Sequence, residues 1–343
     1  MIGIIGDLHL KEKLGYSDYI QDKREAEKKG AFDCIYNEFK DCDDIVFLGD
    51  QLNSRNNTSE VIKELVSFVE RFGDKEIYMI AGNHEKKGDG RSAIDFMRET
   101  NKKNWHIITT TTEKHNLHGI ESVFLPYFHC SELGVDDKEE GISKTLAELE
   151  KIGKADVLFH HFAVSGTKTS TGTSTSIFDE IVLPKEKVSK MYKMVIGGHV
   201  HKPQMDGNVL VAGSIFTNEV GEDEKFVYKL DDKIEVSKKK LPLRGIHKLT
   251  DPTQKDIDEI KKGDIVKVEL TVKQTEAKKT KLKEMLEEKF DTYVLLENYP
   301  SEREKIDFDS SDLDFTVEAM LKKFSEINKI NADDLINAFN EIK

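Results

Sequence analysis

The sequence predicts an α/β protein whose buried strands end in polar motifs. Five apolar runs have the length of strands, and each is followed at once by a group of aspartate, histidine, glycine or asparagine residues. Residues 18–39 and 59–72 have helical length and lie between the first three runs, so strands and helices alternate as in βαβ units. Ligands of such folds bind beyond the carboxyl ends of the strands. We therefore expect one site that is built from all five motifs.

The motifs supply oxygen and nitrogen ligands in a fixed order along the chain. They are Asp7-Leu8-His9, Gly49-Asp50, Gly82-Asn83-His84-Glu85, His160-His161 and Gly198-His199-Val200-His201. Carboxylate, amide and imidazole groups together suit Mn²⁺, Fe²⁺ or Zn²⁺ better than Ca²⁺. They are too many for one closed tetrahedral site and fit two adjacent ions, an arrangement that hydrolyses phosphate esters.

The order D-x-H, G-D, G-N-H-[D/E], a single H and G-H-x-H resembles the calcineurin-like metallophosphoesterases. The resemblance covers residues 1 to about 230. It implies a four-layer αββα sandwich with a dinuclear metal site at the edge of the sheets. It also implies two divalent ions as cofactors, and Mn²⁺ is the ion that we expect.

The resemblance further assigns a role to each motif residue. One metal would be held by Asp7, His9, Asp50 and His201. The other would be held by Asp50, Asn83, one of the paired histidines and His199, so that Asp50 bridges the two ions. His84 would bind no metal and would protonate the leaving oxygen or stabilise the transition state. The family more often has aspartate after this histidine, and here Glu85 stands there, so the group that orients His84 stays open.

Two details of the motifs need a choice. In recombination nucleases of this superfamily the ligand histidine is commonly followed by four residues and a glycine, and Gly166 has that spacing from His161. This favours His161 as the ligand, with His160 as the alternative. His199 and His201 would point in opposite directions on an extended strand, so we expect the glycines before them to provide a turn.

Further elements follow from the pattern of the rest of the chain. We expect strands at residues 122–128, 193–197, 209–212 and 226–230, and a helix at residues 141–151. Residues 165–176 are rich in serine, threonine and glycine and predict a mobile loop without regular structure.

The carboxyl-terminal third predicts separate parts. The phosphoesterase domain would span residues 1–244, and a small α/β capping domain would span 245–300, with strands at 265–272 and 293–297 around a helix at 276–289. Residues 301–343 would hold an acidic linker and two helices, 316–327 and 332–342, whose apolar positions recur at helical spacing. These helices would bind a partner or pack on the small domain.

This order of domains resembles the SbcD-type nuclease subunits of recombination and repair complexes, in their bacterial or phage forms. The resemblance implies a Mn²⁺-dependent DNA exonuclease or endonuclease, a homodimer, and a helical tail that docks on an SbcC-like ABC-type ATPase. The chain has no G-x-x-x-x-G-K-[S/T] motif, so it cannot supply the ATPase itself. The alternative is a phosphodiesterase or phosphatase for a small molecule or phosphoprotein. A scaffold without turnover is disfavoured, because every ligand type and His84 are present.

The composition agrees with an enzyme of a bacterial cytoplasm or of a phage-infected cell. The chain has no basic start typical of a signal peptide, no apolar run of about 20 residues, and only 3 cysteines without a C-x-x-C pair. The formal net charge of −13 is unusual for a protein that binds nucleic acid. Basic residues near the motifs could contact phosphates or be solvated loop charges: Lys11, Lys13, Lys86, Lys87, Arg91 and Lys202.

Overall fold

Two six-stranded sheets dominate the described part of the chain. The computed structural model describes residues 1–15, 20–170, 172–217, 222, 224–290, 292–298 and 331. The chain divides into two compact units, Met1–Asn298 and Tyr299–Lys343. The predicted linker and both predicted tail helices lie outside the described residues, and Asn331 is the single described residue after Asn298.

The first sheet has the strand order β14-β13-β1-β2-β3-β4. Its parallel strands are β1 (Ile2–Ile5), β2 (Asp44–Phe47), β3 (Glu76–Ile80) and β4 (Trp105–Ile108). Two antiparallel strands complete it, β13 (Phe226–Leu230) and β14 (Val236–Lys240). The crossover helices are α1 (Gln21–Glu38) and α2 (Ser59–Glu70), as the sequence predicted to within a few residues.

The second sheet has the strand order β11-β12-β10-β7-β6-β5. Its parallel strands are β6 (Ile120–Leu125), β7 (Val157–His160), β10 (Met194–Gly197) and β12 (Val209–Val211). Antiparallel strands form both edges, β5 (Glu113–Leu117) and β11 (Gln204–Asp206). The helices of this half are α3 (Lys138–Ile152) and α4 (Lys185–Met191).

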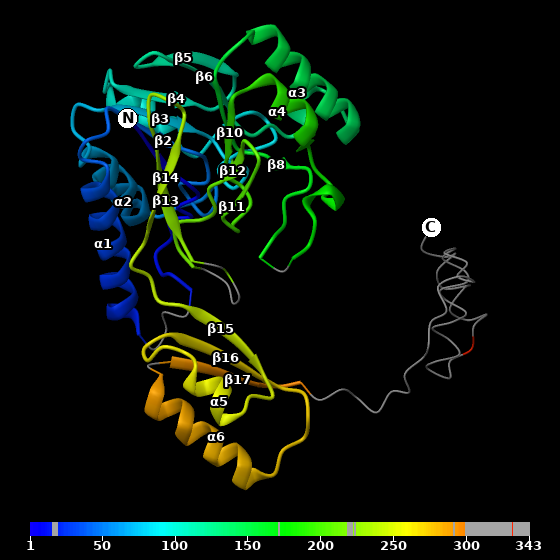
Figure 1. Cartoon of the computed structure of the whole chain (residues 1–343). Coiled ribbons are helices and arrows are strands. Elements are labelled where there is room, and N and C mark those ends of the chain that lie inside the picture. The colour runs from blue at the N-terminus through cyan, green and yellow to red at the C-terminus, as the bar shows by residue number, and fades with distance from the viewer. Residues whose placement is uncertain are drawn as a thin grey trace. The chain divides into compact units, whose positions relative to one another are not determined.

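The helices and the two large sheets lie in four layers (Figure 1), and apolar cores fill the three spaces between these layers. The central core joins the facing sides of the two sheets, for example through Ile4 of β1 and Phe159 of β7. The outer side of the first sheet packs on α1 and α2, and that of the second sheet packs on α3 and α4. Strands that are buried on both faces need continuous apolar runs, which explains the runs in the sequence. The predicted αββα sandwich is confirmed.

A third sheet of three parallel strands belongs to the carboxyl-terminal part of the described chain. Its strands are β15 (Ile246–Thr250), β16 (Ile265–Leu270) and β17 (Thr292–Glu297). Its helices are α5 (Gln254–Asp258) and α6 (Glu276–Lys289). The sequence predicted β16, α6 and β17 but missed β15, a short strand with alternating burial. The division at residue 244 stays a prediction.

The described residues of the serine- and threonine-rich segment form a loop with internal hydrogen bonds. Its backbone turns back on itself, because Thr169 and Thr173 form a hydrogen bond, as do Thr175 and Thr167. The buried hydroxyl groups of Thr167 and Thr175 each donate to the Val164 carbonyl at 2.7 Å. The segment joins β8 (Ala163–Val164) to η3 (Thr175–Ile177) and β9 (Val182–Leu183). The segment is a loop, as expected, and side-chain hydroxyls stabilise its turn, which leaves no periodic pattern in the sequence. Its mobility stays a prediction.

None of the described helices is long and apolar enough to cross a membrane. Shorter elements complete the described fold, namely the 3₁₀ helices η1 (Asp95–Thr100) and η2 (Cys130–Leu133).

The central core generates a test of the packing. Phe159 is 0% exposed and its ring stacks on that of Phe124 with the centroids 5.1 Å apart. Replacing Phe159 with alanine leaves a cavity between the sheets and should lower the free energy of unfolding by about 3–5 kcal/mol. Chemical denaturation followed by circular dichroism measures the loss. Met205→Ala is the control, since Met205 is 56% exposed, and an equal loss in both variants would contradict the assigned core.

Candidate metal centre

The loops after five parallel strands meet where the carboxyl edges of the two large sheets adjoin. Strands β1, β2 and β3 are neighbours in one sheet, and β7 and β10 are neighbours in the other. Three groups of side chains therefore place their ligand atoms within 4.8 Å of one another: Asp7 with His9 and His201, His9 with Asp50 and His84, and Asp7 with Asp50 and His161. Asn83 and His199 contact the same cluster. The structure thus brings together the predicted ligands and the predicted acid, with His161 of the histidine pair.

Asp50 lies at the middle of the cluster. Its Oδ2 is 3.3 Å from His161 Nε2 and 3.6 Å from His9 Nε2. Its Oδ1 accepts a hydrogen bond of 2.9 Å from the backbone N–H of His84, which fixes the orientation of the carboxylate. One carboxylate therefore faces two histidines that belong to different predicted ligand sets.

Asp7, His9 and His201 form the first ligand set. Asp7 Oδ2 accepts the backbone N–H of His199 at 2.9 Å, while its buried Oδ1 has no hydrogen-bond partner among the described residues. The Nε2 atoms of His9 and His201 face each other at 2.8 Å. One hydrogen bond between the rings satisfies the two facing nitrogens, but the buried Asp7 Oδ1 without a partner requires a positive charge nearby. These donors fit a divalent cation.

Asn83, His161 and His199 form the second set. Asn83 Oδ1 is 3.1 Å from His161 Nε2 and 3.0 Å from His199 Nδ1. The opposite ring nitrogens have other acceptors, because His161 Nδ1 donates to the Leu48 carbonyl at 2.6 Å and His199 Nε2 donates to Glu180 at 2.7 Å. Those bonds fix the tautomers and leave the nitrogens beside Asn83 free to bind a cation.

The structure places His161 rather than His160 in the cluster. His160 is fully buried and its Nδ1 accepts the backbone N–H of Phe162 at 3.2 Å. Burial lowers the pKa of His160 to about 3, so its ring is neutral. Its ring also packs where Gly197 has no side chain, which gives it a packing role.

His84 is exposed at the mouth of the cluster and is oriented by a group that the sequence did not suggest. Its Nδ1 is 2.9 Å from the carbonyl of Asn53, and its ring centroid is 4.7 Å from that of His9. Glu85 is buried and accepts the backbone N–H groups of Leu52 at 2.9 Å and Gly82 at 3.0 Å. Glu85 therefore holds two loops together, and Asn53 orients His84. No sequence signal could mark a backbone carbonyl.

Glycines permit the close approach of neighbouring motifs. A Cβ atom on Gly49 would lie 2.2 Å from His161 Nδ1, and one on Gly82 would lie 2.1 Å from Asp50 Oδ1. The expected turn before His201 is not made by glycine, because His199 itself has a positive φ of 75°. Gly198 is needed for space instead, since its Cβ would lie 2.4 Å from Asp7 Oδ1.

Backbone strain marks the same loops. His9 has a φ of 45° and Asp50 a φ of 50°, in the left-handed region that non-glycine residues seldom adopt. Together with His199, three of the motif residues have this geometry. Such strain persists where the surrounding contacts require it and concentrates at functional sites.

The buried charges shift the titration of the cluster. Burial raises the pKa of Asp50, but His161 and His9 outweigh burial and hold the pKa below its usual range. Burial lowers the pKa of His161, but Asp50 and Asp7 outweigh it and raise the pKa to about 10. Without a metal ion, His161 therefore keeps a proton at neutral pH, and a cation that binds there must displace it.

Two of the basic residues near the motifs have structural partners. Lys86 is buried, and its ammonium group lies 2.6 Å from Glu132 and donates to the Thr109 carbonyl at 2.7 Å. Lys86 is therefore not available to a substrate phosphate, and it is not a solvated loop charge either. Arg91 is exposed and pairs with Asp89.

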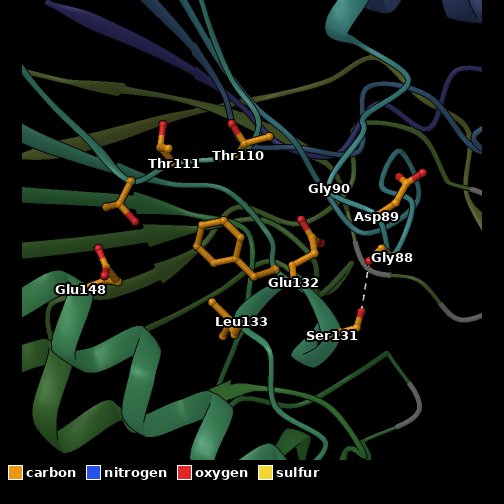
Figure 2. Close-up of a pocket in the computed structure, with 11 residues that line it drawn as sticks. Gly88, Asp89, Gly90, Thr110, Thr111, Ser131, Glu132, Leu133 and Glu148 are labelled. Atoms are coloured by element: carbon orange, nitrogen blue, oxygen red, sulfur yellow. Dashed lines mark hydrogen bonds between the residues drawn. The ribbon is translucent and has the colours of Figure 1, made fainter.

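A cavity of about 710 Å³ lies beside the loop that follows the Gly82-Asn83-His84-Glu85 motif (Figure 2). None of the predicted site residues lines it. Its charged lining residues are the acidic Asp89, Glu132 and Glu148, which would repel a phosphate. The cluster itself borders a different cavity of about 360 Å³, which is lined by Phe178, His199 and His201 together with hydroxyl side chains of the 165–176 segment.

The family model for calcineurin-like phosphoesterases matches residues 1–203, and the chain belongs to this family. The fold and the ligand cluster agree with this assignment. Among solved structures it is similar to a putative 5'-nucleotidase from Staphylococcus aureus, with 16% identity, a TM-score of 0.44 and coverage of 70% of this chain. The chain spans about half (52%) of that structure.

A second similar structure is a protein of unknown function from Aquifex aeolicus. It shares 14% identity and a TM-score of 0.27, and the match covers 62% of this chain and 89% of that one. No curated protein is similar enough to match the sequence.

The protonated state of His161 predicts pH-dependent metal binding. Mn²⁺ must displace the His161 proton, whose pKa is about 10 in the metal-free protein. The affinity should therefore rise with pH, by up to about tenfold per pH unit between roughly pH 6 and 9. Titration calorimetry in two buffers of different ionisation enthalpy measures both the affinity and the released protons. An affinity that is constant over this range would contradict the assignment.

Proposed function

We propose that this phosphoesterase is a Mn²⁺-dependent DNA nuclease of the SbcD type, which acts in the cytoplasm of a bacterium or of a phage-infected cell. The observation that carries the proposal is that Asp50 joins two ligand sets beneath an exposed histidine. Two-metal sites of this kind cleave phosphate esters. The preference for DNA is supported by the order of domains that the sequence predicts.

Seven of the residues would bind two metal ions, and an eighth would act as the general acid. Asp7, His9, Asp50 and His201 would hold one ion, and Asp50, Asn83, His161 and His199 would hold the other. The ions supply Lewis acidity and activate water for attack at phosphorus. The remaining chemistry belongs to side chains of the chain.

His84 is the candidate general acid. Its Nδ1 faces the Asn53 carbonyl and so carries a hydrogen, which leaves Nε2 as the atom that can present a proton to the leaving oxygen. The ring is exposed, so a substrate can reach it. General acid catalysis is worth about 10²–10⁴-fold in rate.

The same centre would serve the alternative substrate classes, a small phosphodiester or a phosphoprotein. A direct comparison of substrates separates them. Purified protein with Mn²⁺ is given end-labelled linear duplex DNA, circular single-stranded DNA and a dye-linked phosphodiester, each with an EDTA control. Metal-dependent loss of DNA supports the nuclease. Turnover of the dye ester with intact DNA would favour the small-substrate enzyme.

His84→Gln tests the assignment of the acid. The variant should lose at least about 10²-fold in cleavage rate and keep both Mn²⁺ ions, because we assign His84 no role as a ligand. Gel assays and metal analysis by mass spectrometry measure the two effects. His118→Gln is the control, an exposed histidine that pairs with Asp44 outside the cluster. Loss of one metal ion from His84→Gln would show that the assigned role is wrong.

The predicted tail supplies the partner proposal. Residues 299–343 form a unit apart from residues 1–298, so their removal should leave the phosphoesterase folded. Deleting residues 314–343 should spare cleavage of short DNA but release an SbcC-like ABC-type ATPase in a pull-down from co-expressing cells. Retention of the ATPase by the shortened chain would refute docking through the tail. Light scattering of the same preparations tests the proposed homodimer.

A further inference from the structure

We propose that Glu180 and Glu222 are positioning residues, one for each ligand set. Glu180 would fix His199 of the Asn83 set, and Glu222, held by Lys225, would fix His201 of the Asp7 set. Neither glutamate belongs to a motif of the sequence. The inference rests on the proposed metal centre and assigns the groups that orient its two carboxyl-terminal ligands.

Glu180 holds the His199 ring from its far side. Its Oε1 accepts the His199 Nε2 hydrogen at 2.7 Å, and its Oε2 accepts the hydroxyl of Tyr127 at 3.3 Å. The Tyr127 ring lies nearly parallel to the His199 ring, at 27° with the centroids 6.0 Å apart. With Nε2 and the ring face both engaged, Nδ1 remains directed at Asn83 Oδ1.

Glu222 occupies the matching position behind His201. Its Oε1 lies 3.4 Å from His201 Nδ1, and its Oε2 lies 3.0 Å from the ammonium group of Lys225. Lys225 also donates to the carbonyl of His201 at 3.2 Å. The lysine therefore contacts both the backbone of the ligand and the carboxylate that faces its ring.

The same lysine connects His201 to Asp7. Lys225 donates to the hydroxyl of Ser214 at 2.7 Å, and Ser214 forms an isolated bridge with Asp7. The next residue, Ile215, donates its N–H to the Asp7 carbonyl at 2.7 Å. Two ligands of one set are therefore fixed by one buried network, whereas Glu180 contacts a ligand of the other set.

The burial of Lys225 and Glu222 argues for a positioning role. Lys225 is 2% exposed and Glu222 is 9% exposed. A buried ion pair adds little stability, because desolvation offsets much of the attraction. A carboxylate behind a ligand histidine, in contrast, fixes its tautomer and orientation and typically changes metal affinity 10- to 100-fold.

The test uses metal affinity rather than activity as its readout. Glu180→Gln and Glu222→Gln should each weaken one of two Mn²⁺ sites by about 10- to 100-fold in titration calorimetry, and the other site should keep its affinity. Glu222→Asp should restore part of the loss. Glu113→Gln is the matched control, since Glu113 pairs with His115 at 2.9 Å outside the centre.

Double variants assign each glutamate to its site. Asn83→Ala removes a ligand of the second set and should leave one bound Mn²⁺ per chain. Adding Glu222→Gln should then weaken the remaining site by about 10- to 100-fold, while adding Glu180→Gln should change it by less than about twofold. Lys225→Met should act as Glu222→Gln does.

Three results would overturn the proposal. The first is that both single variants bind two Mn²⁺ ions with wild-type affinity. The second is that each glutamine substitution weakens both Mn²⁺ sites equally. The third is that the loss of Mn²⁺ affinity is explained by unfolding of the variant, as seen by circular dichroism. Failure of the proposed function is distinguishable: a wild-type chain that binds two ions but cleaves no DNA refutes the nuclease and leaves the positioning test valid.

Discussion

The structure of the site follows from the burial of two carboxylates in one cluster. Asp7 and Asp50 are fully enclosed, and burial together with the charge of Asp50 raises the pKa of Asp7. Such a pair is tolerable only beside positive charge. His161 and His201, whose pKa values are raised, and the expected cations meet this need. The loops that carry these groups must therefore lie close together. The requirement for closeness explains both the glycines of the motifs and the strained backbone at the ligands.

This constraint also bears on the net charge of −13. Lys86 and Lys225 are buried in ion pairs with Glu132 and Glu222, so neither adds to a basic surface. Attraction of a phosphodiester would therefore come mainly from the metal ions at the edge of the sheets. An acidic chain can act on a polyanion if its positive charge is concentrated where the bond breaks.

In the tertiary structure, residues outside the ligand set orient the ligands and the acid. Asn53 orients His84 through a backbone carbonyl, and Glu180 contacts His199 from a loop before β9. Glu85 ties the loop of Asn83 to that of Asp50 through two backbone N–H groups. These contacts join segments far apart in the chain, so the geometry of the centre depends on the packing of both sheets.

The sequence by itself determined the fold class and the composition of the cluster, because buried parallel strands need apolar runs and metal ligands must be specific residue types. The resemblance to recombination nucleases also favoured His161 over His160, through the spacing to Gly166. Only the tertiary structure decided which atoms face each other, that His199 rather than a glycine makes the turn, and that Glu85 holds loops instead of orienting His84. Edge strands such as β15, and supporting residues such as Glu222, have no local pattern, since their contacts arise from residues distant in the chain.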